Sequence, residues 1–204
     1  MLSLSDFIAD FAALFPAQAR WLPWELTAQL PHLIPDWIAT LGDDYHVQDG
    51  VAIHRTARLE QGVVLKAPIL IHADCFVGAH AYLRGGVVLS EGVSVGPGCE
   101  LKTSLLCPQS AVAHFNFIGD SVLGRRVNFE AGALTANHFN ERTDKRIRIQ
   151  YQRAVLDTGV TKFGALVGDD SRIGANAVLS PGSLLPPRSV VGRLALVDQS
   201  VPAS

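Results

Sequence analysis

The segment VAIHRTARLEQGVVLKAPILIHADCFVGAHAYLRGGVVLSEGVSVGPGCEL, residues 51–101, carries a large aliphatic residue at every sixth position. These residues are Ile53, Leu59, Leu65, Ile71, Val77, Leu83, Leu89, Val95 and Leu101. A second, smaller set stands two positions before each of them: Val51, Ala57, Val63, Ile69, Cys75, Ala81, Val87, Val93 and Cys99. The spacing returns later at Val167, Ile173, Leu179, Leu185 and Val191. Such an unbroken run indicates an internal repeat.

A six-residue period fits neither an α-helix nor the two-residue alternation of a simple strand. It is typical of a left-handed parallel β-helix, in which each hexapeptide supplies a short strand and a turn. Three hexapeptides complete one triangular coil, and the large aliphatic residues stack inside it. The sequence therefore predicts an all-β solenoid over residues 49–204, with Cys75 and Cys99 as small core fillers. Such prisms commonly associate side by side, so we expect a homotrimer with sites in the grooves between copies.

Residues 1–48 have a different character from the repeat. Apolar residues stand at helical spacing in the first part of the segment: Leu4, Phe7, Ile8, Phe11 and Leu14. Four prolines, Pro16, Pro23, Pro31 and Pro35, are expected to divide the rest into short pieces. All three tryptophans of the chain, Trp21, Trp24 and Trp37, lie here and need a surface to pack on. We expect a helical N-terminal cap over the end of the solenoid, with recognition of a partner as the alternative.

The composition excludes several classes of partner. The net charge is −2, which provides no basic surface for nucleic acid or anionic lipid. The three cysteines, Cys75, Cys99 and Cys107, form no CxxC pair, so a disulfide framework or zinc ribbon is not expected. The apolar run at the N-terminus lacks basic residues before it and contains Asp6 and Asp10, unlike a signal peptide. The expectation is a soluble, cytoplasmic protein.

The repeat changes step within AVAHFNFIGD, residues 111–120. Counting on from Leu101 gives Cys107 and Ala113, then steps of five to Ile118 and Leu123. His114 stands at the first short step. A polar, net basic stretch follows over about residues 138–161 and is predicted to leave the coil as an extruded loop. Irregularity in a regular scaffold is a place to look for chemistry.

The stretches AHFNFIGDSVLG and VNFEAGALTAN resemble the acetyltransferase domain of the bifunctional GlmU enzymes, over roughly residues 75–195. GlmU acetylates glucosamine-1-phosphate with acetyl-CoA and then uridylylates the product in a separate domain. The resemblance implies His114 as the catalytic base and Asn137 as the asparagine beside it. It implies Asn128, Lys102 and Arg84 as substrate-binding residues. It also implies Ala131 and Ala175 as lining positions of the acetyl-CoA site.

Three departures from the GlmU pattern bear on the substrate. Phe117 stands where the family has a substrate-contacting tyrosine, so one hydroxyl contact is lost. The stretch after Asn137 is longer than in GlmU, and Lys145, Arg146 and Arg148 are the candidates for its substrate-contacting lysine. No uridylyltransferase segment is present, so the resemblance implies acyl transfer alone or work beside a separate nucleotidyltransferase.

These residues suit transfer of an acetyl group from a thioester to an amine. Histidine titrates near neutrality and can take the amine's proton, while Asn137 could orient the imidazole or donate to the oxyanion. Arg84 and Lys102 are 18 residues apart, which is one coil, so they should stack on one edge. Two stacked cations attract an anion between them, and a sugar phosphate or nucleotide sugar would supply it.

Two other classes of function remain open. A hexapeptide metalloenzyme resembling γ-type carbonic anhydrase needs three histidines that meet between prisms, and the spacing of His72, His80 and His114 does not match that pattern. No metal site is therefore expected. A non-catalytic scaffold for a nucleotidyltransferase would keep the repeat without needing His114, Lys102 and Arg84 together. His54, His72, His80 and His138 are expected at the surface.

Overall fold

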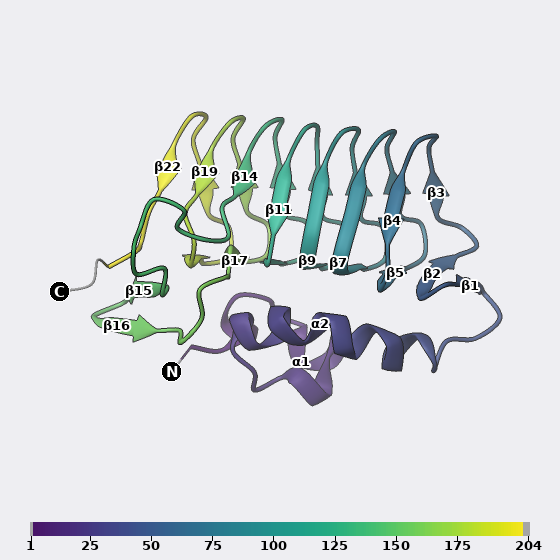
Figure 1. The fold of residues 1–204 in the computed structure, drawn as a ribbon, viewed down its shortest axis with the longest axis horizontal. Helices are drawn as coiled ribbons and strands as arrows, with labels where there is room; N and C mark the ends of the chain where they lie inside the picture. The colour runs from purple at the N-terminus through teal and green to yellow at the C-terminus, as the bar shows by residue number, and fades with distance from the viewer. Residues whose placement is uncertain (1, 202–204) are drawn as a thin grey trace.

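The structure, a computed structural model that describes residues 2–201, is a β-solenoid with a helical N-terminal segment at its side. The coils follow one another along the long axis, and neighbouring strands on each face run parallel (Figure 1). This confirms the repeat architecture predicted from the six-residue period. Among residues 2–201, no helix is both long and apolar enough to cross a bilayer.

The solenoid has three faces, which are defined here by their strands. The seven-stranded face consists of β3 (Arg58–Leu59), β6 (Phe76–Val77), β8 (Ser94–Val95), β10 (Ala111–Val112), β13 (Asn128–Phe129), β18 (Arg172–Ile173) and β21 (Val190–Val191). The Lys102 face consists of β4 (Val64–Lys66), the first parts of β7 (Tyr82–Leu89) and β9 (Glu100–Leu106), β11 (Phe117–Gly119), β14 (Leu134–Thr135), β19 (Val178–Leu179) and β22 (Leu196–Val197).

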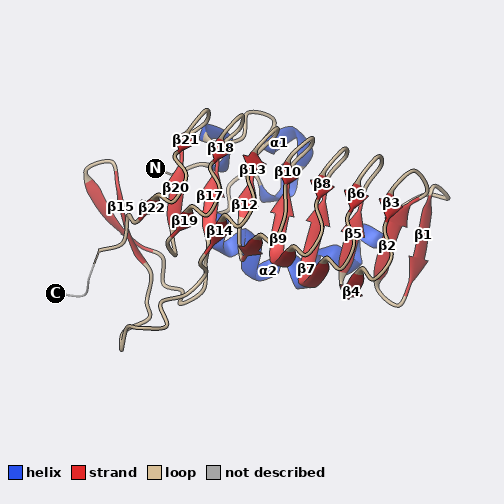
Figure 2. Cartoon of the chain, turned by 90° about the horizontal axis from the view of Figure 1, so that it is seen from above, coloured by secondary structure: helices blue, strands red, loops and turns tan. Residues whose placement is uncertain are grey.

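The third face is called the covered face because other parts of the chain lie on it. It consists of β2 (Val51–His54), β5 (Ile69–Ile71), the second parts of β7 and β9, β12 (Val122–Leu123), β17 (Ala165–Val167) and β20 (Ser183–Leu185). Strand β1 (Tyr45–Gln48) pairs antiparallel with β2 at the N-terminal edge. Strands β7 and β9 continue around the corner between the Lys102 face and the covered face, which joins the two faces into one sheet (Figure 2).

The interior follows the two residue sets of the repeat. The large aliphatic residues from Ile71 to Leu101 are fully buried, and Cys75 and Cys99 fill small inward positions as predicted. In the middle coils the small positions become polar: Ser104, Ser110, Asn116 and Ser121 are all buried. Each of these side chains is hydrogen-bonded; Asn116 Nδ2, for instance, donates to the carbonyls of Glu130 and Ala133, both at 2.8 Å. A buried polar group costs stability unless it is bonded in this way.

The short steps of the repeat do not fall at His114. The inward residue after Leu101 is Leu106, and the next are Val112 and Ile118, so the prediction of a slip between Ala113 and Ile118 was wrong. The five-residue steps are Leu101 to Leu106 and Ile118 to Leu123. Both turn the corner between the Lys102 face and the covered face.

The corner residues explain the short steps. One coil earlier, the chain turns with two glycines at positive φ, Gly85 and Gly86. The next two coils turn through Thr103 and Asp120, with φ of 49° and 45°, and the register between β7 and β9 shifts there by one residue. A β-branched residue such as threonine rarely adopts this left-handed conformation. The irregularity therefore belongs to the corner that holds Lys102 and Asp120.

The N-terminal segment lies along the covered face and not over an end of the solenoid, which is the place predicted from the sequence (Figure 1). It contains 3-10 turns at Leu4–Asp6 and Pro16–Gln18 and the helices α1 (Phe11–Leu14) and α2 (Pro23–Ile38). The α2 side chains of Leu26, Leu30 and Ile34 are fully buried. They belong to one cluster with the middle residues of the face: Ala52, Leu70, Val88, Leu105, Val122, Leu166 and Leu184.

Helix α2 is continuous, although the prolines were expected to divide it. Pro23 occupies its first turn, where a missing N–H costs nothing. Pro31 and Pro35 lie inside the helix, and each removes one backbone hydrogen bond. Burial of one apolar side against the solenoid outweighs that loss, because tertiary packing supplies most of the stability of a helix in a protein.

Residues 136–164 leave the coil between β14 and β17, and they fold back onto the covered face. Strands β15 (Arg148–Tyr151) and β16 (Ala154–Asp157) form an antiparallel hairpin within this segment. Phe139, Ile147, Ile149 and Phe163 are buried in the same cluster as α2. The ring of Phe163 meets that of Trp24 edge-on, with centroids 5.6 Å apart. The segment between β14 and β17 thus covers the part of the face beyond α2.

Candidate functional site

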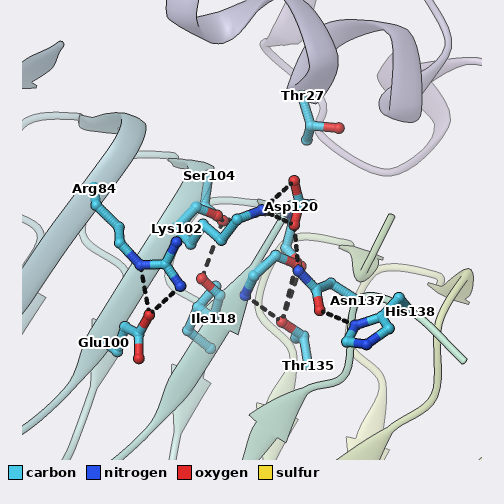
Figure 3. A network of polar contacts seen from close by, with 12 residues as sticks. Thr27, Arg84, Glu100, Lys102, Ser104, Ile118, Asp120, Thr135, Asn137 and His138 are labelled. Carbon is cyan, nitrogen blue, oxygen red and sulfur yellow. Dashed lines mark hydrogen bonds and ion pairs between the residues drawn. The ribbon is translucent and has the colours of Figure 1, made fainter. Parts of the chain in front are cut away.

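The corner between the Lys102 face and the covered face holds two ion pairs on neighbouring coils (Figure 3). Arg84 pairs with Glu100, with Nη2 2.7 Å from Oε1. Lys102 pairs with Asp120, and its Nζ lies 2.7 Å and 3.0 Å from the two carboxylate oxygens. Arg84 and Lys102 do stack one coil apart, as predicted. However, the protein itself supplies an anion for each, so the stacking does not require a bound phosphate.

Asp120 connects this ion pair to Asn137. The residue is 7% exposed, and its Oδ2 also accepts a short hydrogen bond from Asn137 Nδ2. Asn137 is 9% exposed and follows β14 at the point where the chain leaves the coil. Its Oδ1 lies 3.2 Å from Nδ1 of His138, whose ring is exposed (Figure 3). Lys102, Asp120, Asn137 and His138 therefore form one polar chain from three successive coils.

His114 lies on the other edge of the Lys102 face. It is an exposed residue in the turn between β10 and β11. Its carbonyl accepts from Gly132 N, and the carbonyl of Ala131 accepts from Asn176 N, so these turns stack coil upon coil. The stacking brings His114, Ala131 and Ala175 onto the same edge. Among residues 2–201, no group forms a hydrogen bond with the His114 ring.

Asn137 and His114 are therefore not brought together, because they lie at opposite ends of the Lys102 face. Phe117 lies between them in β11, beside Glu100 and Leu134 on the neighbouring strands. A Cβ added to Gly119 would meet the Phe117 ring at 2.6 Å and Asn137 Nδ2 at 3.1 Å. The aromatic ring thus extends across the face toward the Asn137 end.

Asn128 lies apart from the other candidates. It is exposed in β13 on the seven-stranded face, in a groove of about 300 Å³ that Glu130, Arg172 and Arg193 also line. Glu130 Oε2 accepts from Arg193 Nε at 3.0 Å and from Ala175 N at 2.9 Å. These bonds hold the pKa of Glu130 below its usual value. The groove joins the Ala175 turn rather than the Lys102 corner.

Two of the three basic candidates in the segment 136–164, Arg146 and Arg148, form ion pairs within that segment. Arg146 pairs with Asp157 at 2.7 Å, and Arg148 pairs with Asp144 at 2.9 Å. Lys145 is exposed. None of the three lines the cavity described next, in the part of the chain that the structure describes.

A cavity of about 450 Å³ opens beside Asp120. Three parts of the chain line it: Thr27 and Ala28 of α2, Thr103 and Asp120 of the corner, and Gly159, Val160, Thr161 and Lys162 before β17. Thr27 faces Asp120 from the helix (Figure 3). The cavity combines a carboxylate, a lysine and threonine hydroxyls, groups that can bond to a polyhydroxylated ligand.

Sequence reasoning missed Glu100, Asp120, Lys162 and the role of His138. The signal for Asp120 was weakened by the short corner: the coil after Lys102 has 17 residues, so Gly119 pairs with Lys102 in register and Asp120 follows directly after it. Glu100 stands 16 residues after Arg84 and faces it from the next coil. Lys162 could not be found in this way, because it lies outside the repeat.

The sequence of this chain is similar to those of several named proteins. A family model described as the hexapeptide repeat of succinyl-transferase matches residues 68–102. GlmU of Methanococcus vannielii is 27% identical over 186 residues, which cover 88% of this chain and 44% of the relative. A sugar-1-phosphate nucleotidylyltransferase/acetyltransferase of Sulfurisphaera tokodaii is 30% identical over 146 residues, 71% of this chain and 36% of the relative. The chain thus spans less than half the length of either protein.

A third relative is similar in length to this chain. The uncharacterized acetyltransferase YaiX of Escherichia coli K12 is 29% identical over 203 residues, which cover 92% of this chain and 86% of the relative. The match therefore includes the N-terminal segment as well as the coils. Together with the repeat and its stacked coils, these similarities show that the chain is related to the hexapeptide-repeat acetyltransferases, among them the acetyltransferase domain of GlmU and YaiX.

Proposed function

We propose that this protein transfers an acyl group, most simply acetyl from acetyl-CoA, to the amino group of a sugar phosphate or nucleotide sugar, with His114 as general base. The name of the Sulfurisphaera relative joins acetyl transfer to sugar-1-phosphate chemistry. The observation that carries the proposal is the edge on which His114 stands exposed, with the small residues Ala131 and Ala175 at the stacked turn positions of the next two coils. The coils stack at about 5 Å, so a pantetheine arm has room along this edge.

The reaction forms a C–N bond and breaks a C–S bond. The neutral amine attacks the thioester carbonyl, and a backbone N–H of the turns would stabilise the developing oxyanion. His114 accepts the proton that the amine loses. It then returns that proton to the departing CoA thiolate, which leaves as the free thiol.

The Lys102 face provides a track for the acceptor. Phe117 follows His114 by three residues, about 10 Å of extended chain, so an acceptor with its amine at His114 would extend over the Phe117 side chain. Its far end then reaches the Lys102 corner and the cavity beside Asp120. Arg84 and Lys102 already have carboxylate partners, so an anionic substituent would bind by sharing them.

The same edge supports the homotrimer. Phe115 and Leu194, in the turns that contain His114 and Arg193, are 76% and 78% exposed. A second copy packed there would cover both side chains and enclose the groove beside His114. Light scattering should give a mass near three chains, and Phe115→Asp should reduce it. A monomeric wild type would contradict the intersubunit groove.

The test is a thiol-release assay with acetyl-CoA and a panel of amino sugars, amino-sugar phosphates and nucleotide amino sugars. The buried cysteines keep the background low. We expect CoA release with at least one acceptor, an acetylated product in the mass spectrum, and a loss of about 10²–10⁴-fold in kcat for His114→Ala. The control is His32→Ala, on the exposed side of α2. The proposal fails if no acceptor exceeds background or if His114→Ala matches the wild type.

A further inference from the structure

The chain of polar contacts at the corner determines which nitrogen of His138 carries the proton. The chain starts from Lys102, whose Nζ donates to both oxygens of the Asp120 carboxylate. A carboxylate held by an ammonium group only accepts hydrogen bonds. The group of Asn137 that faces Asp120 must therefore be its NH₂, because its carbonyl oxygen would meet another acceptor there.

The orientation of Asn137 then fixes the next contact. With the NH₂ on Asp120, the Oδ1 atom faces Nδ1 of His138 at 3.2 Å. An amide oxygen only accepts, so Nδ1 of His138 must carry a hydrogen. In the neutral ring this leaves Nε2 without one, with its lone pair directed away from Asn137. The other tautomer would place two lone pairs against each other.

The surroundings leave Nε2 open to a ligand. The ring of His138 is exposed, and within residues 2–201 no group bonds to Nε2. Asp120 and Asn137 are both buried, so the support behind the ring is fixed while its outer nitrogen meets solvent. Which ring nitrogen of a histidine carries the proton is set by the hydrogen bond that the other nitrogen makes.

We propose that His138 is an acceptor-binding residue whose Nε2 accepts a hydrogen bond from a hydroxyl or amino group of the substrate, with Asn137, Asp120 and Lys102 as positioning residues. The inference rests on the proposed function for the identity of the ligand as the sugar acceptor. The unprotonated Nε2 of the neutral ring accepts a hydrogen bond from an N–H or O–H group. It cannot donate one to a phosphate oxygen. His138 thus binds a hydroxyl or amino group of the acceptor at the end of the Lys102 face opposite His114.

The first test needs no activity. Long-range ¹H–¹⁵N spectra of the labelled full chain above pH 8 report the tautomer of each histidine, and His138→Gln assigns the His138 signals by their loss. We expect His138 as the Nδ1–H tautomer in the wild type and a shift toward the Nε2–H tautomer in Asn137→Ala and Asp120→Ala. An Nε2–H tautomer in the wild type, or no change in either variant, would overturn the positioning argument.

The second test concerns substrate binding. One hydrogen bond corresponds to a factor of about 3 to 10 in affinity, so His138→Phe should raise KM for the acceptor by that factor. His138→Gln, which keeps an accepting oxygen, should recover part of it, and KM for acetyl-CoA should not change. His32→Phe is the matched control on α2. Equal acceptor KM values in His138→Phe and wild type would refute the binding role.

The two proposals fail in distinguishable ways. If no acceptor is acetylated, the proposed function is refuted. The tautomer of His138 is tested separately by the ¹H–¹⁵N spectra, which do not depend on activity. Binding is then measured by saturation-transfer NMR with glucosamine and glucosamine-1-phosphate. Contact signals with glucosamine that disappear in His138→Phe support the inference, and signals that persist unchanged in that variant overturn it.

Discussion

Gly86, at the corner between the Lys102 face and the covered face, lies directly against Pro31 of α2. A Cβ added to Gly86 would stand 3.0 Å from the backbone nitrogen of Pro31 and 3.2 Å from its Cα and Cδ. The φ of Gly86 is also +93°, in a region that side chains rarely adopt. The close contact between α2 and the solenoid therefore requires a glycine at position 86. A larger residue would clash with Pro31 and would also have to adopt an unfavourable positive φ.

Replacing Gly86 with alanine should destabilise the fold. Both the close approach and the positive φ act against the new methyl group, and we expect a loss of about 2 kcal/mol or more in the free energy of unfolding. Urea unfolding followed by tryptophan fluorescence measures it, because all three tryptophans lie in the N-terminal segment. Gly42→Ala is the control, since Gly42 has open space around it and no positive φ. Equal stabilities of the two variants would contradict the contact.

Lys102→Met should cost more than Lys102→Met combined with Asp120→Asn. The Lys102 and Asp120 side chains are only 18% and 10% exposed. Removal of the ammonium leaves a largely buried carboxylate without a counter-charge, at a cost of about 3 kcal/mol. The second change removes that charge, and asparagine also tolerates the positive φ at position 120. A double-mutant cycle from denaturant melts measures the coupling; additive effects would show that the pair is not coupled.

The three thiols should not react in the native protein. Burial raises the pKa of Cys75 to about 11, and it also raises the pKa values of Cys99 and Cys107. The thiolate is the nucleophile, and at pH 8 a thiol with a pKa near 11 is ionised to about one part in a thousand. Titration with a thiol-reactive dye should find three groups only after denaturation. Rapid labelling of the folded chain would contradict this.

His72 should make the protein less stable in acid. Burial lowers its pKa, with a smaller contribution from His54, and its Nδ1 lies 2.7 Å from the Tyr45 hydroxyl, which can donate to the neutral ring. Because the folded pKa lies below the unfolded value, the contribution to stability is complete above about pH 6.5. It is lost as the pH falls through the lowered value.

The comparison for His72 is His72→Asn, which keeps an acceptor for Tyr45 but does not titrate. The free energy of unfolding should fall less between pH 7.5 and pH 5 in the variant than in the wild type. Urea titrations at the two pH values measure both drops. Equal drops would show that His72 does not carry this dependence.

Filling the corner cavity should weaken acceptor binding. Ala28 lines the cavity from an exposed position of α2, so Ala28→Trp adds bulk there without disturbing the core. The expected result is a higher KM for the acceptor with an unchanged KM for acetyl-CoA. Gln29→Trp, at the next exposed position of the helix, does not line the cavity and should leave both values alone. The cavity has no role in acceptor binding if the two variants behave alike.

The repeat made the interior predictable up to Leu101 but not through the middle coils. Leu106 and Cys107 are both apolar, as are Val112 and Ala113, so counting by six finds an acceptable residue even when it has lost the register. Only the backbone at Thr103, with its positive φ, shows that the corner is one residue shorter there. The same loss of register affected the candidate site. Lys102 was predicted as a site residue, but its partner Asp120 was not, because Asp120 lies in the second five-residue step.

The position of the N-terminal segment on the covered face was not predicted for a different reason. The middle residues Ala52, Leu70 and Val88 repeat every 18 residues and stay apolar, although in a bare prism they would face water. This pattern indicates that one face of the solenoid is covered. It becomes visible only when residues 18 apart, one full coil, are compared, and not residues six apart. The continuity of α2 through Pro31 and Pro35 could not be inferred from local propensity, because it depends on the surface beneath the helix.

The bonds of Asp169 to the N-terminal segment set an order of events during synthesis. Its backbone nitrogen donates to Phe7 O at 2.9 Å, and its Oδ2 accepts from Ala9 N at 3.0 Å. The N-terminal segment is thus synthesised about 160 residues before part of its binding surface. Until the coils around Asp169 exist, its phenylalanines and tryptophans remain incompletely covered. During that interval the uncovered apolar side chains make the growing chain prone to aggregation.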